Sequence, residues 1–439
     1  MLSTEEEHSI SHLKPETPAE APSTGRKSVA WMVMVACVAV FGICLRLWLP
    51  VGFHGMGFDE ALYRVYLLGL DHTGLVEYDG ISQAFLQDQR KPDSMCKLPP
   101  TRFLYVYCGW LWKRAAFGDA PPLDVKQPDN VVRDPALVSL HRISILFSIL
   151  SFFLAGAAAW RLLGQVPGLV IFAFMAVAPL QLHMGGHALI DGFFAFWAIL
   201  VLWSLWENLR QPNHGGWLTL YGIALVLMVV TKENAFFVFV AVMALLALNR
   251  WARFGTVSPR LLLITVGGPL VGVGILVFLA GGLSNLIEIY HLLVTKAEHL
   301  DYAILTGDGP WYRYLVDEMV LSPIILCLAI GAGLHLVRKN KPLLFLTGFI
   351  VFTYAIMCQV RHGMNLRYGT IWDFPLRALA GAQLADLSVL LGRWRRVGFV
   401  AAVVAICGYE LWQYRAFFVA DGLYEIPTAS LLRAVDILK

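Results

Sequence analysis

The sequence predicts an all-α integral membrane protein with about eleven transmembrane helices and a large first extracytoplasmic loop that carries amphipathic interfacial helices. Composition is the first reason. Of the 439 residues, 58% are hydrophobic and only 15% are charged, whereas a typical soluble domain has about 25% charged residues. The net charge of +3 is too small to indicate a nucleic-acid partner. The other reasons are a series of long apolar runs and the distribution of basic residues between them.

The amino-terminal region predicts a disordered cytoplasmic tail, residues 1–28, followed by the first span. The tail is polar and rich in Glu, Ser, Pro and Thr, a composition that buries little apolar surface. Arg26 and Lys27 directly precede residues 29–49, a run of about 20 residues that is long enough to cross hydrocarbon and lacks a small-residue cleavage site. We expect an uncleaved signal anchor, with residues 29–439 forming one transmembrane domain.

Further apolar runs follow, and the segment 98–117 decides how they thread through the bilayer. If 98–117 lies at the outer interface as an amphipathic helix, the basic connections all fall in the cytoplasm, as the positive-inside rule favours. If it crossed the membrane, they would face outward. The apolar runs are 141–163, 167–183, 191–208, 216–231, 234–248, 260–282, 319–337, 342–358, 371–390 and 397–415. The basic connections are 161–167, 207–216, 250–260, 338–341 and 393–396.

With this topology the C-terminus lies outside, residues 50–140 form the first extracytoplasmic loop, and the conspicuous polar motifs gather on the outer side. These motifs lie in that loop, at 183–191, at 232–233, within 283–317 and at 359–370. A carrier built from inverted repeats would instead place polar groups at mid-membrane in two matching halves, and that pattern is not visible in the sequence.

Acidic residues are the first candidates for catalysis. Asp59 and Glu60 open a helical pattern in the first loop, and Asp191 starts the span at 191–208. Favourable placement near a helix N-terminus explains the first two, and an N-cap explains the third. The functional alternative is that the Asp59-Glu60 pair and Asp191 supply active-site carboxylates at the membrane surface, where charged groups are costly and usually have a task. One of them could take a proton from an attacking hydroxyl.

Basic residues on the same side are candidates for binding a phosphate. Lys97 precedes Pro99-Pro100, Lys232 lies in a short turn beside Glu233, and Arg361 and Arg367 flank an outer span end, the latter followed by Tyr368. The alternatives are that Lys97 is a solvated loop lysine, that Lys232 and Glu233 neutralise each other, and that the two arginines anchor the span end at the interface. Guanidinium groups bind phosphate in a bidentate manner, and lysine binds it as a point charge.

A divalent metal is a further option, while no other cofactor is indicated. His183 and His187 are four residues apart, a ligand-like spacing on a helix, but no glutamate stands beside them as in metalloprotease motifs. His187 could join Asp59 and Asp191 around a metal ion.

Together these residues suit transfer from a lipid phosphate. The phosphate leaves as an anion, so cations rather than a general acid would stabilise it. The acceptor hydroxyl needs a base, and one carboxylate suffices. A retaining route would need a second carboxylate placed as nucleophile, so the pattern favours single-step inversion.

The order of these motifs resembles that of polytopic glycosyltransferases of the GT-C fold, over about residues 29–385. Such enzymes include protein O-mannosyltransferases and the aminoarabinose and galacturonic acid transferases that act on lipid A. The motifs are Asp59-Glu60, Lys97-Leu98-Pro99-Pro100, Leu140-His141-Arg142, Asp191, Thr231-Lys232-Glu233, the stretch GPWYRYL at 309–315, and Leu366-Arg367-Tyr368.

The resemblance implies that Asp59 is the base, that Lys97 lies near the donor phosphate, and that Asp191 and Arg367 with Tyr368 complete the site. It also implies a polyprenyl- or dolichyl-phosphate-linked monosaccharide as donor, and some relatives bind a divalent metal. The chain departs from some relatives in ending soon after its last span, in lacking a lumenal β-domain, and in the polar stretch 119–134. We therefore expect a bacterial inner-membrane enzyme whose acceptor is an envelope glycan or lipid rather than a protein.

Two rival functions remain. A transporter or flippase of a lipid-linked anion would use the same cations but would need charges deep within the spans. A non-catalytic scaffold would use the first loop only to dock a partner.

Overall fold

The computed structural model describes residues 24–48, 52, 55–360, 363–435 and 437. The chain divides into two compact units, Met1–Cys37 and Val38–Lys439, and the contacts below are those of the second unit. Helix α1 covers Thr24–Trp48, so it starts before the predicted boundary at residue 29. The rest of the predicted tail lies outside the described residues.

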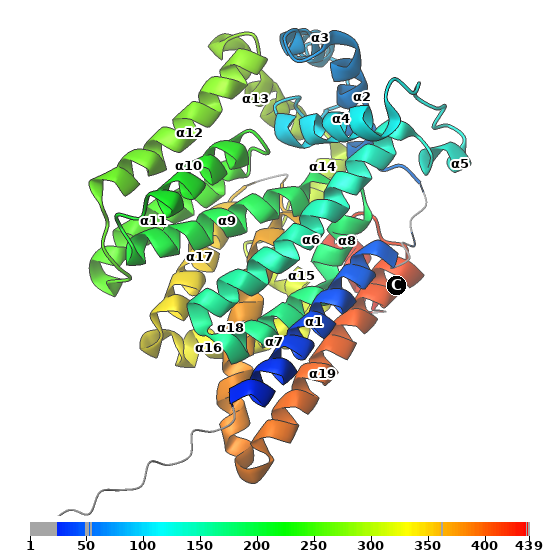
Figure 1. The fold of residues 1–439 in the computed structure, drawn as a ribbon. Helices are drawn as coiled ribbons and strands as arrows, with labels where there is room; N and C mark the ends of the chain where they lie inside the picture. The colour runs from blue at the N-terminus through cyan, green and yellow to red at the C-terminus, as the bar shows by residue number, and fades with distance from the viewer. Residues whose placement is uncertain (1–23, 49–51, 53–54, 361–362, 436, 438–439) are drawn as a thin grey trace, which may run out of the picture. The chain divides into compact units, whose positions relative to one another are not determined.

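Each predicted apolar run contains helix. The helices at these runs are α6 (Pro135–Leu163), α7 (Gln165–Ala176), α8 (Pro179–Gly186), α9 (Ile190–Arg210), α10 (Gly215–Val229), α11 (Ala235–Ala252), α12 (Pro259–Leu279), α16 (Pro323–His335), α17 (Lys341–Met357), α18 (Asp373–Leu387) and α19 (Arg395–Tyr414). In Figure 1, α10 and α12 lie side by side, as do α16 and α18.

Shorter helices connect these elements. The first loop contains α2 (Phe58–Thr73), α3 (Tyr78–Gln89), α4 (Phe103–Phe117) and α5 (Pro128–Val131). Later connections contain α13 (Leu283–Ala297), α14 (Asp301–Gly307), α15 (Arg313–Leu321), η1 (Val337–Lys339), η2 (Leu366–Trp372) and η3 (Ser388–Trp394). After α19 come η4 (Arg415–Ala420) and α20 (Thr428–Ala434).

The described residues confirm a multi-pass helical membrane protein but do not reach the predicted count of eleven spans. Five helices are long and apolar enough to cross, and α7 with α8 makes a sixth if this pair, bent by 48°, is one span. Helices α10, α16 and α17 are apolar but shorter. The run predicted at 167–183 is broken because Pro179 starts a new helix, and Pro323 does the same within 319–337.

Several helix starts combine a capping side chain with a proline in the first turn. Asp134 caps α6 by accepting a hydrogen bond from the Leu137 amide at 3.0 Å. Ser258 caps α12 through the Leu261 amide at 3.1 Å. In both cases Pro follows the cap directly, where its missing N–H costs no hydrogen bond. These signals fix where the helices begin.

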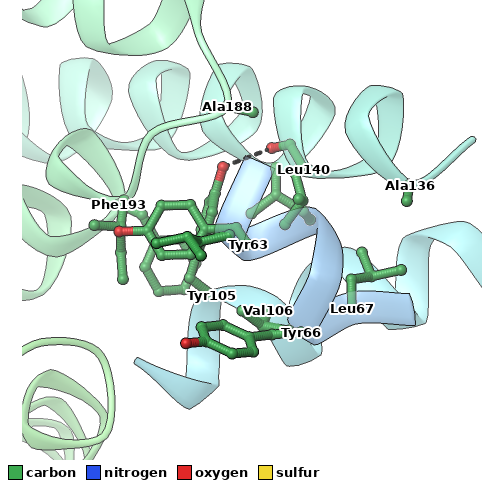
Figure 2. Packing of buried hydrophobic residues seen from close by; sticks show 12 residues of the cluster. Tyr63, Tyr66, Leu67, Tyr105, Val106, Ala136, Leu140, Ala188 and Phe193 are labelled. Atoms are coloured by element: carbon green, nitrogen blue, oxygen red, sulfur yellow. Dashed lines mark hydrogen bonds between the residues drawn. The ribbon is translucent and has the colours of Figure 1, made fainter. Parts of the chain in front are cut away.

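The first-loop helices pack on the start of the transmembrane bundle through aromatic side chains (Figure 2). The Tyr63 and Tyr105 rings meet edge to face at 5.3 Å, and Tyr105 meets Phe193 of α9 at 5.5 Å. The Tyr105 hydroxyl donates to the Leu140 carbonyl of α6 at 3.1 Å. Such pairs add to the free energy of burial, and they hold the first turns of α2 close to those of α9.

Candidate active site

Asp59 lies in the first turn of α2, as predicted, and its side chain is only 7% exposed. Its Oδ2 forms an ion pair with NH1 of the Arg367 guanidinium at 2.7 Å. Placement near a helix N-terminus alone would not require burial against a cation. The structure therefore brings together two of the predicted site residues, from positions about 300 apart in the sequence.

Arg367 lies on η2 and faces three carboxylates. Besides Asp59, it contacts Asp191 at 3.9 Å and Glu425 at 3.4 Å. Burial lowers the pKa of Arg367, but these carboxylates raise it further, so that the pKa stays well above its ordinary value. The guanidinium is thus permanently charged at the centre of the site.

Lys232 brings a second cation to the same place. It lies in the turn between α10 and α11, and its Nζ donates to Asp191 Oδ1. The same Nζ lies 4.1 Å from the centre of the Tyr368 ring, a cation–π contact. Both Lys232 and Asp191 are buried, so the structure joins the predicted Asp191, Lys232, Arg367 and Tyr368 in one cluster.

One interpretation of the sequence was that Glu233 and Lys232 form a pair, but in the structure Glu233 pairs with a different cation. Its carboxylate is bound by the guanidinium of Arg102, which also donates to the Tyr63 hydroxyl at 2.8 Å. Burial raises the pKa of Glu233, but Arg102 and Lys232 lower it further, so the carboxyl remains ionised. The ionic partner of Lys232 is therefore Asp191.

Glu60 holds the start of α2 against the connection between α8 and α9. Its carboxylate accepts from the Gly57 and Ala188 amides, both at 2.7 Å, and lies 3.7 Å from His187 Nδ1. Burial raises the pKa of Glu60, but the contact with His187 and these two amides lower it below its ordinary value overall. Glu60 thus shapes the site without contacting Arg367 directly.

The residues present do not fit the metal site considered from the sequence. Asp59 and Asp191 face Arg367 and Lys232, and His187 faces Glu60. Among the described parts of the chain, no group of three or more His, Cys, Asp or Glu could hold a metal ion. Carboxylates already paired with cations are poor ligands for a divalent metal.

One predicted phosphate contact, Lys97, stands apart from this cluster. It is 38% exposed and pairs with Asp88 at 2.8 Å. Arg361 lies outside the described residues.

Sequence reasoning missed Arg102, Asn365 and Glu425. Glu425 follows α19 and η4, and its carboxylate accepts from the Asn365 amide at 3.0 Å as well as from Arg367. No local pattern marks it, because only the return of the C-terminal chain over η2 brings it to Arg367. Arg102 had a weak signal, a charge at the start of an aromatic helix.

Residues 102–299 match the sequence profile of the PMT family, dolichyl-phosphate-mannose-protein mannosyltransferase. This stretch is a PMT-family domain. It includes Arg102, Asp191 and Lys232 of the site, whereas Asp59 and Arg367 lie on either side of it. The predicted class, a glycosyltransferase that depends on a lipid-phosphate sugar, is confirmed by this match. No curated protein matches the sequence.

Solved structures share the fold over nearly the whole chain, including the stretch that matches the PMT family. ArnT from Cupriavidus metallidurans bound to undecaprenyl phosphate is 14% identical, with 94% of this chain and 77% of that chain covered and a TM-score of 0.52. The oligosaccharyltransferase of Archaeoglobus fulgidus in the apo form is 11% identical, with 94% and 56% covered and a TM-score of 0.55. The predicted GT-C fold is therefore confirmed.

Proposed function

We propose that this protein is an inverting glycosyltransferase that moves one monosaccharide from a polyprenyl or dolichyl phosphate to an extracytoplasmic acceptor. The observation that carries the proposal is the meeting of Asp59, Asp191, Lys232 and Arg367, which come from four separate elements. A buried, preorganised group of charges of this kind suits a reaction that moves charge from one oxygen to another.

In the proposed reaction, Asp59 takes the proton of the acceptor hydroxyl while that oxygen bonds to the anomeric carbon of the sugar. The bond from this carbon to the phosphate oxygen breaks, and its electron pair leaves with the lipid phosphate. Asp59 loses its negative charge as the phosphate gains one. Arg367, 2.7 Å from Asp59, can then shift its attraction to the leaving group, which stabilises the transition state.

Lys232 is the proposed second contact of the donor phosphate, and Asp191 and Tyr368 position it. Glu60 is proposed to shape the site by fixing α2. We assign the main phosphate contacts to Lys232 and Arg367. Lys97, exposed beside Asp88, is proposed only as an outer contact on the path of the donor. Arg361, which lies outside the described residues, stays a proposed donor-phosphate contact.

The remaining expectations belong to the same proposal. The chain would cross a bacterial inner membrane about eleven times, with the site on the outer side and an envelope glycan or lipid as acceptor. Undecaprenyl phosphate bound to ArnT supports a polyprenyl donor, since the two chains share a fold.

The transporter alternative rests on charges within the spans. Arg46, Arg377 and Glu410 are buried in three of the predicted runs, but Arg377 pairs with Glu410 at 2.7 Å and Arg46 is bound by backbone carbonyls. These charges have partners inside the protein and form no path for a lipid-linked anion. We therefore favour the enzyme.

Asp59→Asn tests the proposed base. The envelope glycans and lipids of a deletion strain, compared with wild type by mass spectrometry, identify the product, and transfer of radiolabelled sugar from a polyprenyl phosphate is then measured. Asp59→Asn should lower the rate at least about 100-fold, while the protein still inserts and purifies. Asp79→Asn, an exposed carboxylate of the same loop, should leave the rate unchanged. Unaltered transfer by Asp59→Asn would remove Asp59 from this role.

A further inference from the structure

The chain beyond α19 returns to the site and covers it. Residues 421–428 follow η4, and the Tyr424 carbonyl accepts from His183 Nε2 at 2.9 Å. Ile426 is fully buried, and the Thr428 hydroxyl accepts from Arg313 Nε at 2.9 Å. Contacts of this kind on both sides of Glu425 hold the backbone of the segment next to the site, while among the described residues the Glu425 side chain is held only by Arg367 and Asn365.

Gly57, just before α2, is shaped to receive this segment. A Cβ built on Gly57 would lie 1.9 Å from the Tyr424 ring, so any larger residue there would push the ring away. Tyr424 also meets the His187 ring edge to face at 5.0 Å. The residues that begin α2 and those after α19 therefore form one packed unit.

Glu425 is the most exposed of the three carboxylates on Arg367. Its side chain is 24% exposed, against 7% for Asp59 and 3% for Asp191. It shares NH1 of Arg367 with Asp59, at 3.4 Å compared with 2.7 Å. Its other partner is the neutral amide of Asn365.

The charges of this cluster do not favour an incoming anion. Three carboxylates, Asp59, Asp191 and Glu425, contact two cations, Arg367 and Lys232. The excess negative charge opposes a phosphate, and two of the carboxylates share NH1 of Arg367. An anionic donor therefore binds more favourably here when one carboxylate gives up Arg367.

We propose that Glu425 is a positioning residue that holds Arg367 while the site is empty and is replaced on it by the phosphate of the lipid donor. This inference rests on the proposed function, because it assumes that Arg367 binds the donor phosphate. Asp59 stays on Arg367 during the exchange, so that the base and the leaving group come to share one guanidinium.

Glu425 is the carboxylate that moves, because the other two are held in place. Asp59 is in the first turn of a helix and Asp191 is bound by Lys232, and both are buried more deeply. Glu425 lies in a non-helical stretch, reaches solvent and makes the longer contact with NH1. Moving it to water uncovers Arg367 without breaking a helix.

Binding of undecaprenyl phosphate to the full-length protein in detergent tests the exchange without turnover. Glu425→Gln removes the charge and keeps the size, so it should tighten binding about tenfold, equivalent to about 1.4 kcal/mol. Glu425→Asp keeps the charge and should not tighten it. Asp421→Asn, which removes an exposed charge from the same segment, is the matched control and should bind like wild type. In transfer assays Glu425→Gln should lower the donor KM far more than it changes kcat.

Two results would overturn the inference, and they differ in what else they affect. If Arg367→Gln weakens binding of undecaprenyl phosphate but Glu425→Gln does not tighten it, the role of Glu425 is wrong and the phosphate site stands. If wild type, Arg367→Gln and Glu425→Gln all bind it equally, the phosphate does not lie on Arg367, and the proposed donor site falls as well. Melting temperatures of the variants confirm that each is folded.

Discussion

Lys232 and Lys97 show how burial separates two lysines that the sequence treats alike. In the predicted topology both lysines lie in short motifs on the outer side of the membrane. Lys232 is buried and its Nζ donates to Asp191 Oδ1. Lys97, by contrast, pairs with a carboxylate that is itself 34% exposed. A charge in a site from which water is excluded interacts far more strongly than one at the surface.

We therefore expect Lys232→Met to lower kcat about 100-fold or more, because a preorganised cation is lost from the leaving group. Lys97→Met should change it by no more than about twofold, because an exposed ion pair contributes little. Both variants are measured in the same transfer assay with the same donor. Equal losses for the two lysines would contradict the assignment of the main phosphate contact to Lys232.

The residue types that form the cluster can be predicted from the sequence, but their partners cannot. Asp59, Asp191, Lys232 and Arg367 stood out because charges at span ends are costly unless they have a task. Their pairing depends on how helices far apart in the chain pack, and neighbours in sequence misled: Glu233 binds Arg102 rather than Lys232. Glu425 carries no local signal at all.

At the scale of elements, the link between α2 and the α8–α9 connection sets the distance between Asp59 and Asp191. Glu60 makes this link through the Gly57 and Ala188 amides and His187. Glu60→Gln keeps one acceptor oxygen and loses the charge. It should lower the free energy of unfolding by about 1–3 kcal/mol near neutral pH, seen as a lower melting temperature in detergent.

The sign of the pH dependence follows from the lowered pKa of Glu60. The stabilising contribution of its carboxylate is complete above the ordinary glutamate pKa of about 4.3 and is lost as the pH falls through the folded value. The difference in melting temperature between wild type and Glu60→Gln should therefore be largest at pH 6–7 and should shrink below about pH 4. Glu77→Gln, at an exposed position of the same loop, should show no such trend. A difference that grows on acidification would be inconsistent with this role.

At the scale of the whole molecule, apolar runs located the helices well because burial in lipid needs long stretches without charge. Two predicted runs are not single helices, because Pro179 and Pro323 each start a new helix inside a run. The count of spans was not recovered, since several helices are shorter than a full crossing. The return of residues 421–428 to the site could not be predicted, because it depends on tertiary packing alone.

A buried charge network joins the two parts of the chain that reach Arg367. Arg377 of α18 binds Asp373 and, at 2.7 Å, Glu410 of α19, which also accepts from the Ser322 hydroxyl at 3.0 Å. Helix α18 follows η2, which carries Arg367, and α19 leads through η4 to Glu425. The network therefore fixes the relative position of both sides of the Arg367–Glu425 contact.

Arg377→Met should lower the free energy of unfolding by about 3–5 kcal/mol, because it leaves two carboxylates buried without their cation. The double variant Arg377→Met/Glu410→Gln should recover part of this loss, since one uncompensated charge is removed with its partner. Melting temperatures in detergent measure both, and Arg90→Met, in an exposed ion pair with Glu288, should barely change them. If Arg377→Met proved as stable as wild type, the carboxylates would not depend on Arg377, and α18 and α19 would be held together by apolar packing alone.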